Sequence, residues 1–145
     1  MEFRRNVFYT RKPNHLMIIE HIPIWTEDID KIKAYYEKYF GAKRSNLYVN
    51  ETTGFKRYFL HFSSGARLEL MLRPNVPTNL NDTVRQHLGL IHFAFEVNAA
   101  DEVERKAREL KDNGFAISRG PTITGDGYYE LETLDPDADR LEVMY

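Results

Sequence analysis

The sequence predicts an α+β fold built from two tandem βαβββ modules. The main observation is an internal repeat: the pentapeptide RLELM at residues 67–71 returns 73 positions later as RLEVM at residues 140–144. A lone histidine on a strand-like run precedes each copy, with His21 48 positions before Glu69 and His92 50 positions before Glu142. A segment with helical periodicity follows each histidine. Repetition of this kind indicates one folding unit used twice.

The first module, residues 17–72, is expected to open with an Ile-rich strand at 17–25. A helix follows, which Thr26 can cap and which Gly41 ends as a left-handed residue. Its apolar stripe repeats at helical spacing. Three strands then follow at hairpin spacing, at about 44–50, 55–62 and 66–72, because glycine-containing turns separate them.

The second module, residues 89–145, repeats this order. A strand at 90–97 precedes a helix that Asn98 caps and Gly114 ends. A short strand near 116–119, a glycine-rich loop from Gly120 to Gly127 that could form a lid, and strands near 128–134 and 140–145 complete it.

Two segments lie outside the repeat. Residues 73–88 contain prolines and several Asn without firm periodicity, so they form the linker between the modules of a single domain that spans residues 17–145. Residues 1–16 form a basic N-terminal extension, for which an added edge strand or a dimer-contacting arm is the favoured interpretation.

Composition narrows the function. A chain of 145 residues fits one domain. The net charge of −2 gives no electrostatic reason to expect nucleic acid as a partner. The absence of cysteine excludes thiolate metal sites and cysteine nucleophiles. Neither a membrane-spanning run nor a signal peptide is visible, so no membrane partner and a cytoplasmic location are expected.

Strand alternation places four candidate metal ligands on equivalent faces. In each strand the uniformly apolar face should pack on the helix, which leaves His21, Glu69, His92 and Glu142 on the other face. Glu20 falls on the helix side by the same rule. A single His or Glu on a second sheet face is usually just solvated. Four at matching positions favour a metal site instead, because facing carboxylates repel one another unless a cation or proton lies between them.

The chain resembles the vicinal-oxygen-chelate superfamily over about residues 17–145. The stretches that carry the resemblance are IPIW at 22–25 leading to YY at 35–36 and FG at 40–41, GARLELM at 65–71, and DP at 135–136 leading to RLE at 140–142. The stretch TGDGYYE at 124–130 is similar to a bacterial, glyoxalase I-like branch. The resemblance implies a curled mixed sheet around a cavity, the glyoxalase/bleomycin resistance/dihydroxybiphenyl dioxygenase fold, and a homodimer. Whether the site forms within one chain or between two chains stays open.

The complete ligand set of His21, Glu69, His92 and Glu142 is most similar to glyoxalase I. This implies a metal-dependent lyase or isomerase, of the lactoylglutathione lyase kind, that acts on a small molecule. The substrate would be a thiol adduct of a 2-oxoaldehyde or a related vicinal-oxygen compound, and a proton would move through a metal-bound enediolate. Glu142 or Glu69 would be the catalytic base. Zinc or nickel is expected, with iron, cobalt or manganese as alternatives.

Two other functions stay open, an extradiol-type dioxygenase and a non-enzymatic protein that sequesters an antibiotic or another small molecule in the manner of bleomycin resistance proteins. One residue departs from the glyoxalase pattern. Trp25 stands where glyoxalase I enzymes usually have an arginine that meets the glutathione carboxylate. Arg57 and Arg119 are candidate substitutes, so the identity of the thiol is open.

Overall fold

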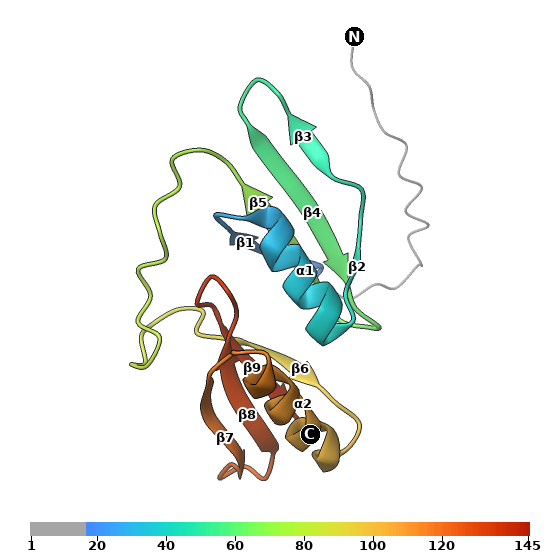
Figure 1. Cartoon of the computed structure of the whole chain (residues 1–145), viewed down its shortest axis with the longest axis vertical. Coiled ribbons are helices and arrows are strands. Elements are labelled where there is room, and N and C mark those ends of the chain that lie inside the picture. Colours follow the sequence, from blue (N-terminus) through green and yellow to red (C-terminus); the bar gives the residue numbers. More distant parts are fainter. Residues whose placement is uncertain (1–16) are drawn as a thin grey trace.

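The computed structural model describes residues 17–145, and the predicted N-terminal arm at residues 1–16 lies outside the described residues. Figure 1 shows two sheets, each accompanied by one helix, stacked along the long axis of the molecule. The first sheet contains β1 (His21–Trp25), β2 (Lys43–Arg44), β3 (Tyr48–Asn50), β4 (Phe55–His61) and β5 (Arg67–Leu72), with helix α1 (Ile29–Phe40). The second contains β6 (Phe93–Glu96), β7 (Ile117–Ile123), β8 (Tyr129–Leu134) and β9 (Arg140–Met144), with helix α2 (Ala100–Asp112).

The two sheets share one topology, so the predicted α+β class of paired modules is confirmed. The strand order is β1-β5-β4-β2 in the first sheet, where β3 also pairs with β4, and β6-β9-β8-β7 in the second. In each sheet the opening strand pairs in parallel with the last strand, β1 with β5 and β6 with β9, and the other pairs are antiparallel. The parallel pairing places each histidine strand directly beside the strand that carries its glutamate.

Both helices begin later than the sequence patterns predict. Asp28, rather than Thr26, is the N-cap of α1: its side chain accepts a hydrogen bond from the backbone of Lys31, while the Thr26 hydroxyl accepts one from the backbone of Asp28. Ala99, rather than Asn98, precedes α2, and its methyl group cannot cap the helix; the Glu102 side chain accepts a hydrogen bond from the Asn98 N–H. At the start of each helix more than one side chain can accept a hydrogen bond from the first backbone N–H groups. The local sequence therefore does not determine which residue is the N-cap.

Four strand predictions also need correction. The expected opening strand at 17–25 begins only at His21, and the strand expected at 90–97 begins only at Phe93, so that His92 precedes it. The strand expected at 44–50 is divided into β2 and β3. The expected lid from Gly120 to Gly127 is wrong for its first half, because β7 continues through Ile123 with irregular pairing to β8. Gly120 fits this strand because a Cβ there would lie 2.3 Å from the Glu130 carbonyl oxygen, closer than any side chain tolerates.

A shared hydrophobic core joins the modules through α1. Its buried tyrosines Tyr35 and Tyr36 contact aromatic residues of the second module, with ring centroids of Tyr35 and Phe115 4.8 Å apart. The Tyr36 hydroxyl donates a hydrogen bond of 2.8 Å to the buried Asp135 carboxyl group. The predicted apolar faces of β5 and β9 are buried in this core: Leu70 and Leu141 have no exposed surface. Both sheets therefore turn their apolar faces toward packed helices.

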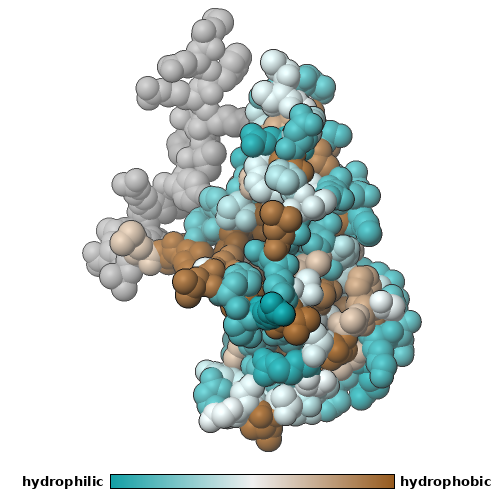
Figure 2. Space-filling view, turned by 90° about the vertical axis from the view of Figure 1, so that its left-hand side faces the viewer, coloured by the Kyte–Doolittle hydropathy of each residue, from teal (hydrophilic) through white to brown (hydrophobic). Residues whose placement is uncertain are grey.

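One face of the molecule is mostly hydrophilic: Figure 2 shows polar side chains there around smaller hydrophobic areas. Exposed apolar side chains include Met17, Ile18 and Ile19, where the described chain begins. Neither helix in residues 17–145 has the length and apolar content needed to span a membrane.

Candidate metal centre

The first predicted ligand pair forms within sheet 1. His21 begins β1 and Glu69 lies on the adjacent strand β5, where the register aligns Glu69 with Pro23. The Nε2 atom of His21 lies 3.4 Å from an Oε2 oxygen of Glu69. The Glu69 side chain is only 12% exposed, whereas that of His21 is 40% exposed. The pair is thus held at a partly open surface of the sheet, opposite α1.

The second pair repeats this geometry in sheet 2. His92 directly precedes β6 and Glu142 lies on β9, and their Nε2 and Oε2 atoms are again 3.4 Å apart. Burial raises the pKa of the Glu142 carboxyl above its usual range, and the nearby carboxylate of Glu130 adds to the rise, while His92 and Arg119 oppose it. A carboxyl group that is difficult to ionise beside an imidazole is suited to exchange a proton or to bind a cation.

The two pairs remain separate within one chain. Among residues 17–145, no group of three or more His, Asp or Glu side chains lies close enough together to hold a metal ion. The reason is the shared core: α1 packs between the modules, and each histidine–glutamate pair occupies the opposite face of its sheet. One chain therefore presents two half-sites, each with one imidazole and one carboxylate.

An arginine lies beside the glutamate of each half-site. Arg57 Nη1 lies 3.4 Å from Glu69 Oε1 in sheet 1. In sheet 2, Arg119 Nη2 lies 2.5 Å from Glu130 Oε1 and 3.8 Å from Glu142 Oε2. The two arginines considered as anchors for a substrate carboxylate are thus already engaged with protein carboxylates.

Sequence alternation misplaced Glu20. Because β1 begins only at His21, the alternation does not extend to Glu20, and its side chain lies beside His21 and not on the helix side. One Glu20 oxygen is 2.6 Å from His21 Nδ1, and the other forms an ion pair with Arg67. The hydrogen bonds from Arg67 and His21 lower the pKa of Glu20. The only signal in the sequence was the adjacency of Glu20 and His21.

Aromatic and arginine side chains cover the same face of sheet 1. Arg57 lies between Tyr48 and Phe59, with its guanidinium carbon 5.2 and 4.8 Å from the two ring centroids. The rings of Trp25 and Phe55 meet edge to face with centroids 6.1 Å apart. Cation–π and edge-to-face contacts of this kind stiffen a surface while leaving flat ring area available. This face could receive a small organic molecule.

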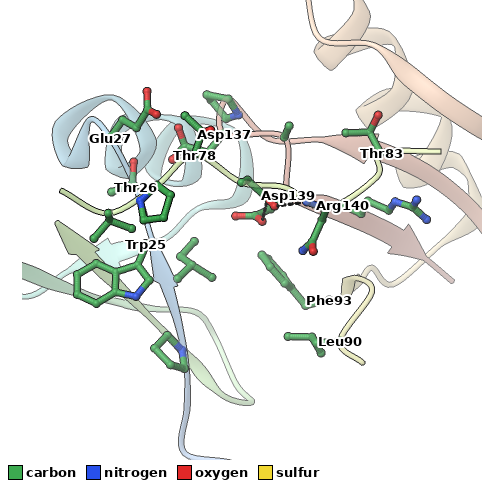
Figure 3. A pocket seen from close by; sticks show the side chains of 18 of the residues that line it. Trp25, Thr26, Glu27, Thr78, Thr83, Leu90, Phe93, Asp137, Asp139 and Arg140 are labelled. Atoms are coloured by element: carbon green, nitrogen blue, oxygen red, sulfur yellow. Dashed lines mark hydrogen bonds between the residues drawn. The ribbon is translucent and has the colours of Figure 1, made fainter. Parts of the chain in front are cut away.

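A cleft of about 1000 Å³ lies where β1, the linker and the β8–β9 turn approach one another. Figure 3 shows Trp25 on one side of this cleft and Phe93, Leu90 and Asp139 on the other. Of the four predicted ligands only His92 lines it. The cleft therefore borders one half-site and is not centred on the predicted chemistry. Its other lining residues include Arg73, Thr78, Asn79, Asn81, Thr83, His87, Asp137 and Arg140.

Comparisons with known proteins agree with this architecture. The family model described as the Glyoxalase/Bleomycin resistance protein/Dioxygenase superfamily matches residues 18–143. Trypanothione-dependent glyoxalase I of Leishmania major is 19% identical, with a TM-score of 0.69 over 89% of this chain and 86% of that chain. A glyoxylase/bleomycin resistance protein/dioxygenase domain from Frankia sp. EAN1pec is 21% identical, with a TM-score of 0.73 over 90% and 98%.

A fosfomycin resistance protein of Listeria monocytogenes, solved with Mn(II) and a sulfate ion, is 18% identical, with a TM-score of 0.67 over 90% of this chain and 93% of that chain. No curated protein matches. At these identities the solved structures establish the fold, and fold alone does not assign a reaction.

Proposed function

The chain belongs to the Glyoxalase/Bleomycin resistance protein/Dioxygenase superfamily, and we propose that it is a metal-dependent lyase or isomerase of the glyoxalase I type. Its substrate would be a thiol adduct of a 2-oxoaldehyde or a related small molecule with vicinal oxygens. The observation that carries the proposal is the pair of matched half-sites, each with His Nε2 and Glu Oε2 3.4 Å apart. A complete site would contain two imidazoles and two carboxylates, a donor set that suits Zn²⁺, Ni²⁺ or another divalent ion.

The donor set fits such an ion only when two half-sites meet, and we propose that they meet across a homodimer. His21 and Glu69 of one copy would face His92 and Glu142 of the second copy. Within residues 17–145 a single chain offers two ligands at either place, and few protein metal centres rely on two ligands. The two-fold symmetry of such a dimer would form two equivalent sites.

Charge complementarity supports this arrangement. The strand registers identify the charged residues on the half-site face of each sheet. On sheet 1 the cationic residues are Lys43, Arg57 and Arg67, and the acidic ones are Glu69 and, directly before β1, Glu20. On sheet 2 the charged residues are mostly acidic: Glu96, Glu130, Glu132 and Glu142, with Arg119 and Arg140. Faces of opposite charge attract one another, whereas two copies of the same face would repel.

In the proposed reaction the bound metal ion would supply Lewis-acid polarisation of the substrate oxygens. Glu142 would accept the proton from the substrate carbon and return it to the adjacent carbon. Its burial leaves little water to compete for that proton, since only 9% of its side chain is exposed. Arg119 pairs with Glu130 and approaches Glu142, so its positive charge would offset the repulsion between these two carboxylates. The aromatic face of sheet 1 would exclude water from the reacting atoms.

Sedimentation and metal analysis test both parts of this proposal. Protein purified without a histidine tag should sediment as a dimer at micromolar concentration and should bind one divalent ion per chain in calorimetry. His21→Ala and His92→Ala should each abolish tight binding, because each removes a ligand from every site of the dimer. Glu51→Ala, at an exposed turn of sheet 1, is the matched control and should bind like wild type. A monomer with two independent weak sites would contradict the shared centre.

A second candidate is a small-molecule sequestering protein that needs no metal. The specific observation in its favour is the aromatic face of sheet 1, on which Trp25 and Tyr48 are each 38% exposed. Trp25 is the only tryptophan of the chain, so its fluorescence reports ligands that contact this face. A protein that binds no divalent ion in calorimetry, yet shows saturable quenching by flat organic ligands in the presence of a chelator, would support sequestration over catalysis.

A further inference from the structure

We propose that Glu20 is a positioning residue that fixes the ring orientation and tautomer of His21, which makes sheet 1 the preorganised half of the metal centre. The inference rests on the proposed function, because the centre itself belongs to that proposal. It goes further in giving the two half-sites unequal roles. The histidine of sheet 1 would be oriented before the ion arrives, whereas the histidine of sheet 2 has no equivalent support from the residue before it.

The contacts of Glu20 form a continuous chain. One carboxylate oxygen lies 2.6 Å from His21 Nδ1, and the other is paired with the Arg67 guanidinium. Arg67 in turn stacks on Phe59, with its guanidinium carbon 3.9 Å from the ring centroid. The His21 ring meets the same phenyl ring nearly edge-on, at 5.6 Å between centroids and 75° between planes. The imidazole of His21 is therefore held by Glu20 at its Nδ1 atom and by Phe59 along the ring.

This geometry determines which ring nitrogen is available. An ionised carboxylate only accepts hydrogen bonds, so Nδ1 of His21 carries the proton that is shared with Glu20. The lone pair of Nε2 is then directed to the side where Glu69 lies, 3.4 Å away. A carboxylate behind a ligand histidine fixes its tautomer and increases its basicity, and the loss of such a partner typically weakens metal binding 10- to 100-fold.

The second module lacks this device at the equivalent positions. Ile91 precedes His92 where Glu20 precedes His21, and within residues 17–145 the recorded polar contact of His92 is with Glu142 alone. Arg140 is the counterpart of Arg67 in the repeat, but its guanidinium donates to the carbonyl oxygens of Asp82 and Arg85, at 2.7 and 2.5 Å. The repeat has thus kept the ligands and the arginine in both copies, while the supporting carboxylate occurs only in the first.

Zinc titration of the full-length chain by calorimetry measures the role of Glu20. Glu20→Ala removes the acceptor, and we expect its affinity for Zn²⁺ to fall about 10- to 100-fold. Glu20→Gln keeps an acceptor oxygen without the charge, so its affinity should lie between Glu20→Ala and wild type. Glu51→Ala removes the same charge from an exposed turn of the same sheet and should leave the affinity unchanged. Equal affinities for Glu20→Ala and wild type would overturn the inference.

Nitrogen-15 NMR of the histidine rings gives a readout that a merely structural role would not change. At a pH where the imidazole is neutral, metal-free wild type should show His21 protonated at Nδ1 alone. Glu20→Ala should show the mixture of tautomers of a free imidazole, with the His92 signals unaffected. If Glu20→Ala keeps the wild-type tautomer, Glu20 does not position His21. If wild type binds no Zn²⁺ the proposed function fails, and the NMR comparison still decides what Glu20 does.

Discussion

Asp135 at the contact between the modules makes the stability of the protein depend on pH. The side chain is 4% exposed, it accepts the Tyr36 hydroxyl at 2.8 Å, and its other oxygen accepts the backbone N–H groups of Asp137 and Asp139 at 2.9 Å. Burial raises the pKa of Asp135 to about 7, and the charge of Asp139 adds to the rise. The folded chain thus holds this proton more tightly than the unfolded chain does.

The sign and size of the effect follow from linkage between protonation and folding. A carboxyl group whose pKa is raised by folding contributes its full stability below the unfolded pKa and loses it as the pH rises through the folded pKa. With a folded pKa of about 7 and an unfolded pKa of about 3.9, wild type should lose about 2–3 kcal/mol between pH 5 and pH 8 through this group. Asp139, whose pKa burial raises to about 6, adds a loss of the same sign.

Asp135→Asn removes the charge and keeps the shape. Its side-chain oxygen can still accept both backbone N–H groups, so at pH 5 the variant should lie within about 1 kcal/mol of wild type. At pH 8 it should be more stable than wild type by about 2 kcal/mol, because it does not bury an ionised carboxylate. Urea unfolding at fixed protein concentration and at pH 5, 6, 7 and 8 measures both curves. Asp112→Asn, at the exposed end of α2, is the control. Parallel curves for Asp135→Asn and wild type would refute the reasoning.

Three further predictions concern the site, the core and a strand. Glu142→Gln should keep a ligand oxygen but lose the base, so turnover should fall roughly 10²- to 10⁴-fold with only a modest loss of metal affinity. Solvent-deuterium exchange at the substrate carbon measures the proton transfer. Exchange at the wild-type rate would assign the proton transfer to another residue. Leu70→Ala removes a side chain with no exposed surface and should cost about 2–5 kcal/mol in urea unfolding, whereas Leu80→Ala, at a 90% exposed position, should cost less than about 0.5 kcal/mol. Gly120→Ala combines a positive φ of 79° with a Cβ 2.3 Å from the Glu130 carbonyl oxygen, so it should destabilise by more than about 1 kcal/mol; an unchanged urea midpoint would show that β7 relaxes there.

Local patterns predicted the repeated parts of the chain well. Alternation in β5 placed Leu68 and Leu70 in the core and Glu69 on the other face, and the structure agrees. The pattern succeeds because a strand has a period of two and one of its faces must be buried. Patterns were weaker where several residues compete for one role. Asp28 caps α1 although Thr26, two positions earlier, is also a residue type that commonly caps helices.

The lid prediction at Gly120 illustrates a different limit. Glycine followed by proline is typical of a turn, yet Gly120 and Pro121 lie within β7. The reason is tertiary, because the close approach of the β8 backbone at Glu130 requires a residue without a Cβ. The prediction for Glu20 was wrong because strand alternation applies only inside a strand. The pairing of β1 with β5 begins at His21, so Glu20 lies outside the strand.

The sequence by itself determined the paired modules, the apolar faces and the four candidate ligands, because each depends on spacing along one strand or one helix. The sequence also shows that Glu20 precedes His21 whereas Ile91 precedes His92. Only the tertiary contacts of Glu20 with His21 and Arg67 suggest a role for that difference. The tertiary structure decided how the ligands are grouped. The packing of α1 against residues of the second module, more than 50 positions away along the chain, separates the half-sites. Contacts between segments so distant in sequence leave no periodic signal, and the free energy of burying aromatic side chains around Tyr35 and Tyr36 selects the arrangement.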